Sequence, residues 1–167
     1  ASMLDTEQID DYIANYLERN GLPVAAIVVV KDGELVYENG YGHDSDWEPL
    51  TAKSKMRLAS GSKPFTAFAV LQLVDEGKVE LDEPAVNYIP ELTLNDTRWN
   101  QVTVRQLLSH TSGLPNPIIV GPADTLKHGV SRFHDWNLQS EPGEKYAYSN
   151  ANYWILAYLV AQVSGMT

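Results

Sequence analysis

A serine and a lysine three residues apart could form an acylation centre. Ser60 and Lys63 make an S-x-x-K pattern, and the apolar run 67–74 and Gly77 follow it. This pattern predicts a helix that starts at the serine and is buried on most sides. Because residues i and i+3 share one face of a helix, the lysine amine can reach the serine hydroxyl. A base that takes the proton activates a serine, and an amine among apolar side chains can have the lowered pKa that this requires.

The S-x-x-K pattern also has a structural interpretation. Serine is a common helix N-cap, and a lysine that follows it can simply be solvated. Both residue types are frequent, so the pattern alone does not decide between the two interpretations.

A second pair of chemical side chains, Tyr148 and Asn150, follows a Pro-Gly turn at 142–143. Residues two apart in an extended segment point to the same side, so the two side chains can act together. A phenol beside an ammonium can shuttle a proton, and an amide can hold a substrate carbonyl or the lysine. The two pairs together favour nucleophilic catalysis.

Other polar patterns are interpreted as structural. A second Tyr-x-Asn, Tyr37 and Asn39, ends a predicted strand just before a glycine. The sequence has four histidines without metal-binding spacing and no cysteine, so we expect no metal site, no cofactor and no disulfide. A G-x-S-x-G elbow is also absent from the sequence, which argues against an α/β-hydrolase triad.

Composition limits the partners. The chain has 167 residues and a net charge of −10, with a pI of about 4.7. Nucleic acids and anionic membrane surfaces favour basic patches, so neither is an expected partner. No apolar run is long enough to span a membrane. We expect an extracytoplasmic, exported protein, or a cytoplasmic one if Met3 is the natural start.

The elements before the serine predict part of a sheet. Residues 4–20 show helical periodicity, with Asp5 as N-cap and Gly21 at the end. Residues 24–30 form a β-branched apolar run, predicted as a strand buried on both faces, and an Asp-Gly turn leads to a second strand at 35–37. An isolated hairpin is marginal in water, so further strands are expected to complete the sheet.

The rest of the sequence predicts short helices. Thr103 and Gln106 form a capping box, and the apolar run 151–163 ends at Gly165. Residues 117–140 show no clear pattern, and Phe133 and Trp136 within them are expected to pack. We therefore predict an α+β fold. A helix and hairpin at 1–43 belong to an antiparallel sheet, and a mostly helical subdomain at 44–167 carries both motifs.

Three segments, 60–90, 102–115 and 142–167, resemble the serine β-lactamase-like and penicillin-binding-protein-like family in the same order. The run LLSHTSGLP at 107–115 is especially characteristic. That family includes class C β-lactamases, D-Ala-D-Ala carboxypeptidases and related esterases. The resemblance implies that Ser60 is the acylated nucleophile and Lys63 its general base. It also implies that Tyr148 shuttles the proton and Asn150 binds a substrate carbonyl, whereas His110 is a structural loop residue.

The resemblance covers the N-terminal half of the family fold only. The third family motif, a Lys or His with Thr or Ser and Gly on a strand, is absent from this sequence. We therefore expect an incomplete β-lactamase/transpeptidase-like fold, completed by a C-terminal half or by a second polypeptide. The implied function is a serine hydrolase acting on a small-molecule or peptide acyl substrate: a β-lactam, a D-amino peptide or a short-chain ester. The alternative is a catalytically inactive ligand-binding or scaffold member of the same fold.

Overall fold

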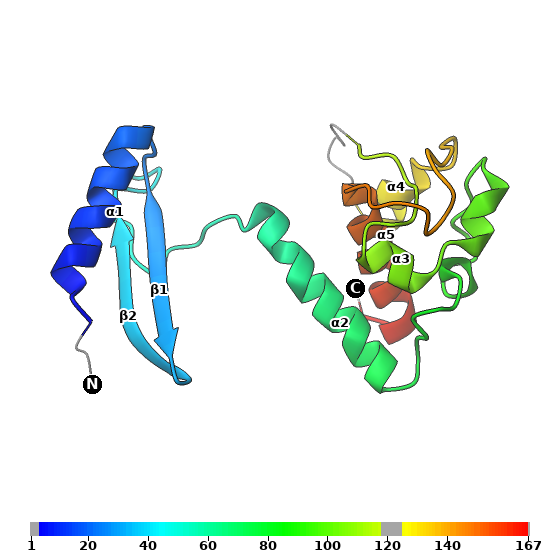
Figure 1. The fold of residues 1–167 in the computed structure, drawn as a ribbon, viewed down its shortest axis with the longest axis horizontal. Helices are drawn as coiled ribbons and strands as arrows, with labels where there is room; N and C mark the ends of the chain where they lie inside the picture. Colours follow the sequence, from blue (N-terminus) through cyan, green and yellow to red (C-terminus); the bar gives the residue numbers. More distant parts are fainter. Residues whose placement is uncertain (1–3, 118–124, 167) are drawn as a thin grey trace. The chain divides into compact units, whose positions relative to one another are not determined.

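The computed structural model describes residues 4–117 and 125–166. The chain forms two compact units, Ala1–Arg57 and Leu58–Thr167, which are described separately (Figure 1). The predicted boundary lies between 43 and 44, whereas residues 44–57 belong to the same compact unit as the hairpin. A backbone hydrogen bond of 2.9 Å from Leu50 N–H to the Gly42 carbonyl contributes to this attachment.

The first unit begins with helix α1 (Thr6–Asn20). The Asp5 side chain accepts a hydrogen bond from the Gln8 N–H at 3.0 Å, which satisfies one of the free donors of the first turn. Gly21 ends the helix in the left-handed conformation, with φ 60°. Both predicted caps are confirmed.

Strands β1 (Ala25–Lys31) and β2 (Glu34–Tyr41) pair as an antiparallel hairpin around a turn with positive φ at Asp32 and Gly33. The second strand is longer than predicted. The prediction that the first strand is buried on both faces is wrong within the described unit, because Val28 and Val30 are 55% and 61% exposed. A hydrophobic run indicates that a strand can be buried, but it does not supply the element that covers it.

A carboxylate on α1 attaches this helix to the hairpin. One oxygen of Asp10 accepts hydrogen bonds from the Tyr37 hydroxyl, from Asn39 Nδ2 at 2.8 Å and from the Tyr41 hydroxyl at 2.6 Å. These donors lie on alternate residues of β2 and therefore share one side of the strand. The second Tyr-x-Asn pattern thus serves an attachment within the first unit.

We expect Asp10→Ala to destabilise the first unit, because three donors lose their common acceptor. The hydrogen bond from Tyr37, followed by those from Tyr41 and Asn39, holds the pKa of Asp10 below its ordinary 3.8. The stabilisation is therefore present above pH 3.8 and is lost as the pH falls through the lower folded-state pKa. Urea unfolding followed by circular dichroism would measure it. Equal midpoints for Asp10→Ala and for the exposed neighbour variant Asp11→Ala would contradict this expectation.

The second unit is helical. Helix α5 (Asn150–Ser164) contacts α2 (Lys63–Asp75), α3 (Val104–Leu108) and α4 (Leu126–Ser131), as Figure 1 shows. Short 3₁₀ turns precede or link these helices: η1 (Ala59–Ser62), η2 (Ala85–Asn87) and η3 (Thr97–Gln101). Helix α4 is not predicted from the sequence, because it lies in the region 117–140, which has no clear pattern.

The core of this unit is formed by large apolar side chains that are almost fully buried. They include Trp99, Phe133, Ile89, Leu107, Ile155 and Leu159. The capping box of Thr103 and Gln106 and the left-handed Gly165 are both present, as predicted. The rings of Phe133 and Trp136 lie 4.3 Å apart, which agrees with a packing role.

One prediction about α2 is wrong for the described unit. Val70 and Leu73 are buried, but Phe65 and Phe68 are 69% and 65% exposed. Most sides of this helix carry its own apolar side chains, so the sequence predicts burial on most sides. It does not say which element would cover each side. No helix in the described residues is long and apolar enough to cross a membrane.

Candidate active site

Ser60 lies in the 3₁₀ turn η1, immediately before α2 begins at Lys63. The S-x-x-K pattern predicts the serine at the start of the helix itself. The consequence for the side chains is the same, because a 3₁₀ turn also brings residues i and i+3 together. Lys63 Nζ donates a hydrogen bond to Ser60 Oγ at 3.1 Å.

The structure brings all four predicted site residues together within the second unit. Tyr148 Oη lies 3.0 Å from Ser60 Oγ, and Lys63 Nζ donates to Asn150 Oδ1 at 2.8 Å. The Tyr148 hydroxyl also donates to Asn150 Oδ1, at 3.2 Å. Asn150 reaches the cluster as the first residue of α5, and so the extended geometry expected for both residues stops before it.

The environment of Tyr148 suits proton transfer. The Lys63 amine, and after it the Ser60 hydroxyl, lower the pKa of the Tyr148 phenol below its ordinary 10.0, while burial opposes them. A positive charge beside a phenol favours the phenolate, which is the form that accepts a proton. Tyr148 is 40% exposed and Ser60 is exposed, so an acyl compound can approach both side chains.

The loop 110–116 supports the segment that carries Tyr148. Its carbonyl groups accept a ladder of backbone hydrogen bonds from the segment 139–147. The pairs are Gln139 N–H to Gly113, Gly143 N–H to Thr111 and Ala147 N–H to His110, each at 2.8 Å. The LLSHTSGLP run is therefore the support on which the second motif is built.

The same loop fixes the two residues that follow Tyr148. Ser149 Oγ donates to the Pro115 carbonyl at 2.8 Å, and the Asn150 N–H donates to Asn116 Oδ1 at 2.9 Å. A side chain at Gly113, where φ is 81°, would place its Cβ 2.5 Å from the Ser140 carbonyl oxygen. The run LLSHTSGLP is characteristic in sequence, but its positioning function cannot be predicted from it, because the contacts join residues far apart in sequence.

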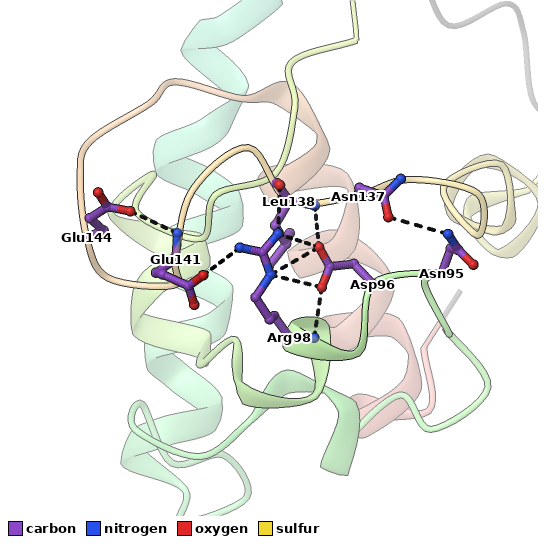
Figure 2. A network of polar contacts seen from close by, with 7 residues as sticks. All are labelled: Asn95, Asp96, Arg98, Asn137, Leu138, Glu141 and Glu144. Carbon is purple, nitrogen blue, oxygen red and sulfur yellow. Dashed lines mark hydrogen bonds and ion pairs between the residues drawn. The ribbon is translucent and has the colours of Figure 1, made fainter.

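An ion pair between Asp96 and Arg98 holds the start of the segment that leads to Tyr148 (Figure 2). Asp96 accepts hydrogen bonds from the Arg98 guanidinium at 2.6 Å and from the Leu138 N–H at 2.9 Å. Arg98 in turn donates to the Leu138 carbonyl at 2.9 Å and to Glu141 Oε1 at 2.7 Å. This network joins η3 to the stretch that leads to Tyr148.

We expect Asp96→Ala to lower the free energy of unfolding by about 2–3 kcal/mol, because Arg98 and the Leu138 N–H lose their shared acceptor. The Asp96 side chain is 10% exposed. Arg98 holds the pKa of Asp96 well below 3.8, so this stabilisation is present above pH 3.8 and is lost at lower pH. Urea unfolding followed by tryptophan fluorescence would measure the change.

The matched control for that variant is Asp82→Ala. Asp82 also pairs with an arginine, Arg105, but its side chain is 76% exposed. An exposed ion pair contributes little, so the unfolding midpoint should hardly move. A loss for Asp96→Ala no larger than that for Asp82→Ala would show that the network of Figure 2 does not stabilise this region.

The described residues gather no group of three or more histidine or acidic side chains that could hold a metal ion. A hydroxyl within hydrogen-bond distance of an amine and of a phenol is a geometry that nucleophilic catalysis can use. The family comparison agrees with this class. The Beta-lactamase family model matches residues 9–167, so the chain belongs to the β-lactamase family, as the motifs predicted.

Individual relatives place the chain within part of a larger fold. It is 33% identical over 168 residues to protein flp of Staphylococcus aureus (strain N315), covering 95% of this chain and 33% of that protein. A class C β-lactamase structure matches with a TM-score of 0.82 and 25% identity, covering 97% of this chain and 45% of that chain. The D-amino acid amidase of Ochrobactrum anthropi SV3 matches with a TM-score of 0.74 and 29% identity, covering 93% and 45%.

The chain therefore spans about a third of the length of the curated relative that it matches. It contains part of the β-lactamase fold, with helices and a two-stranded antiparallel sheet in the described residues. This agrees with the predicted α+β, incomplete fold.

Proposed function

We propose that this chain carries the acylation centre of a serine hydrolase that acts through an acyl-enzyme on amide or ester substrates. The observation that carries the proposal is the position of Ser60 Oγ, 3.1 Å from Lys63 Nζ and 3.0 Å from Tyr148 Oη. A serine between a base and a second proton carrier is the arrangement that nucleophilic catalysis requires. Membership of the β-lactamase family supports the same chemistry.

Acylation uses the three side chains in turn. The Tyr148 phenolate first takes a proton from Lys63, then Ser60 Oγ bonds to the acyl carbon of the substrate and its proton passes to the Lys63 amine. The tetrahedral adduct then collapses, the bond to the leaving group breaks, and Tyr148 gives the leaving group a proton. The phenolate regains that proton from Lys63, so the acyl-enzyme forms with no net change in protons.

Deacylation repeats these steps with water. The Tyr148 phenol passes its proton to Lys63, and the phenolate accepts a proton from water as the water attacks the acyl carbon. The bond to Ser60 Oγ then breaks, and Ser60 takes a proton from Lys63. Asn150 Oδ1 already accepts hydrogen bonds from Lys63 and Tyr148. Its Nδ2 group is therefore the donor that suits a substrate carbonyl. The Ser60 N–H serves as one donor of the oxyanion hole.

Covalent labelling tests the proposed nucleophile. We expect a fluorophosphonate or a fluorescent penicillin to label the protein once when the chain is assembled with the remaining part of the fold, and peptide mapping to place the adduct on Ser60. An adduct at another residue would contradict the assignment. A panel of nitrocefin, p-nitrophenyl esters and D-Ala-D-Ala peptides would then rank β-lactam, ester and D-amino peptide substrates. All three are acyl compounds that a serine attacks in the same way.

We further propose that activity needs the remaining part of the fold, as a C-terminal segment or as a second polypeptide. Two observations support this: the chain covers 45% of the class C β-lactamase structure, and Phe65, Phe68 and Leu71 expose an apolar face of α2. Large exposed apolar faces are typical of surfaces that another element covers. Intact-mass and size-exclusion measurements would test it. A stable, active monomer of this chain alone would show that the proposal is wrong.

The alternative function is that of an inactive ligand-binding or scaffold member of the family. Tight binding of an acyl ligand by the assembled protein, without labelling of Ser60 and without turnover, would support that alternative.

A further inference from the structure

His110 lies next to the proposed active site and makes no hydrogen bond to Ser60 or Lys63 among the contacts of the described residues. It is 8% exposed and has a positive φ of 57°, which is uncommon for a residue with a side chain. Its ring centroid is 4.5 Å from that of Tyr148 and 5.2 Å from that of Tyr153. Lys63 Nζ lies 4.9 Å and 5.8 Å from the same two rings. His110 therefore packs against both rings that the ammonium faces.

The hydrogen bonds of His110 determine which ring nitrogen carries the proton. The backbone N–H of Ser149, between Tyr148 and Asn150, points to Nδ1 at 3.2 Å. A backbone N–H can only donate, so Nδ1 has to be an acceptor without a proton. The neutral imidazole then carries its proton on Nε2.

The side-chain amide of Asn152 is a second donor to His110 Nδ1, and a hydrogen bond from Ser112 fixes the orientation of that amide. Asn152 Nδ2 lies 3.0 Å from His110 Nδ1, while Asn152 Oδ1 accepts from the Ser112 hydroxyl at 2.6 Å. Ser112 Oγ itself accepts the Leu114 N–H at 3.1 Å, which leaves its own hydrogen to donate to Asn152. Each group therefore donates to the next one: Leu114 N–H to Ser112, Ser112 to Asn152, and Asn152 to His110 Nδ1.

The charged form of His110 does not suit this position. A proton on Nδ1 would oppose two donors, and the group would lose both hydrogen bonds. Burial, followed by the positive charge of Lys63, lowers the pKa of His110 below its ordinary 6.5. The other titratable groups that face the ring are the phenols of Tyr146, Tyr148 and Tyr153.

We propose that His110 is a positioning residue, whose neutral, Nε2-protonated ring uses Nδ1 to hold the backbone of Ser149, and with it Tyr148 and Asn150, against Ser60 and Lys63. The purpose of this positioning rests on the proposed hydrolase function. The positioning itself does not, because it can be measured without turnover. Its consequence is that a group outside the reacting atoms determines how close the phenol lies to the lysine.

Nitrogen NMR of the histidine-labelled protein tests the protonation state directly. We expect the His110 ring to be the Nε2-protonated tautomer at neutral pH and to gain its second proton only below the ordinary histidine pKa of 6.5. A proton on Nδ1, or a charged ring at neutral pH, would overturn the proposal. This measurement needs no variant and no substrate.

Two variants separate the acceptor from the ring. His110→Asn keeps an acceptor near the Nδ1 position and tolerates positive φ, whereas His110→Phe keeps a ring and loses the acceptor. With carbon NMR of labelled tyrosine, we expect the pKa of Tyr148 to rise toward 10.0 in His110→Phe and to stay lowered in His110→Asn. Acylation of Ser60 should fall about 10–100-fold in His110→Phe, since small displacements of reacting groups are costly.

The matched control is His134→Phe, because the His134 side chain is 64% exposed. It should leave the pKa of Tyr148 unchanged. An unchanged Tyr148 pKa in a folded His110→Phe protein would overturn the positioning role. The Tyr148 pKa could shift as expected while Ser60 is labelled neither in the unmodified protein nor in any variant. That result would support the positioning role and contradict the hydrolase function.

Discussion

Ser60→Ala will abolish covalent labelling and lower turnover by about 10³-fold or more, because the atom that bonds to the acyl carbon is gone. Lys63 and Tyr148 remain, but neither can replace the hydroxyl that lies between them at 3.1 and 3.0 Å. The residual rate would come from substrate binding and from the hydrogen-bond donors around the carbonyl. Labelling with a fluorophosphonate and steady-state kinetics on the best substrate of the panel would measure both effects.

The control for this variant is Ser62→Ala. Ser62 lies in the same η1 turn, and its side chain makes no capping hydrogen bond to α2. It offers a second exposed hydroxyl two residues away, so a reagent that reacts with accessible serines would label both. We expect Ser62→Ala to keep full labelling. Labelling that survives Ser60→Ala and disappears in Ser62→Ala would show that the nucleophile is Ser62 and not Ser60.

The features that could be predicted from the sequence are those set by neighbours along the chain. The proximity of Ser60 and Lys63 follows from helical geometry, and the caps at Asp5 and Thr103 follow from a side chain bonding to a backbone group three residues on. Such interactions need no knowledge of the tertiary fold. The Ser60–Lys63 contact and both caps therefore occur at the expected positions, even though Ser60 lies in a 3₁₀ turn.

Features that depend on the opposite side of an element could not be predicted. The runs around Phe68 in α2 and Val28 in β1 are apolar on every face, and periodicity cannot say which face has a neighbour. Both side chains are exposed in the described residues. The apolar runs therefore indicate that these segments can be buried, but they do not show that another element covers them.

The support of the second motif was also beyond the sequence analysis. His110 and Ser149 are 39 residues apart, and Asp96 and Leu138 are 42 apart. Nothing in the local pattern of either residue specifies its partner. Resemblance to a family identified Tyr148 and Asn150, but only the structure shows that loop 110–116 and the Asp96–Arg98 pair hold the segment that carries them.

The second large effect is expected for Tyr148→Phe, which removes one oxygen and keeps the ring. Proton transfer by a positioned side chain contributes about 10²–10⁴-fold, so we expect turnover to fall by a factor in that range. The ring should still pack on His110 and face Lys63, because these contacts involve its carbon atoms. The variant therefore tests the hydroxyl separately from the fold, and circular dichroism would confirm that folding is retained.

The pH dependence gives the same variant a sharper test. The phenolate is the form of Tyr148 that accepts a proton, so the rate should rise with pH through the phenol pKa, which Lys63 lowers from 10.0. That rise should disappear in Tyr148→Phe and persist in Tyr146→Phe, a control in the same segment whose side chain is 67% exposed. In Lys63→Met the phenol pKa should move back up, since the amine is the largest cause of its shift. An identical pH profile in Tyr148→Phe and the unmodified protein would exclude the phenol as the proton shuttle.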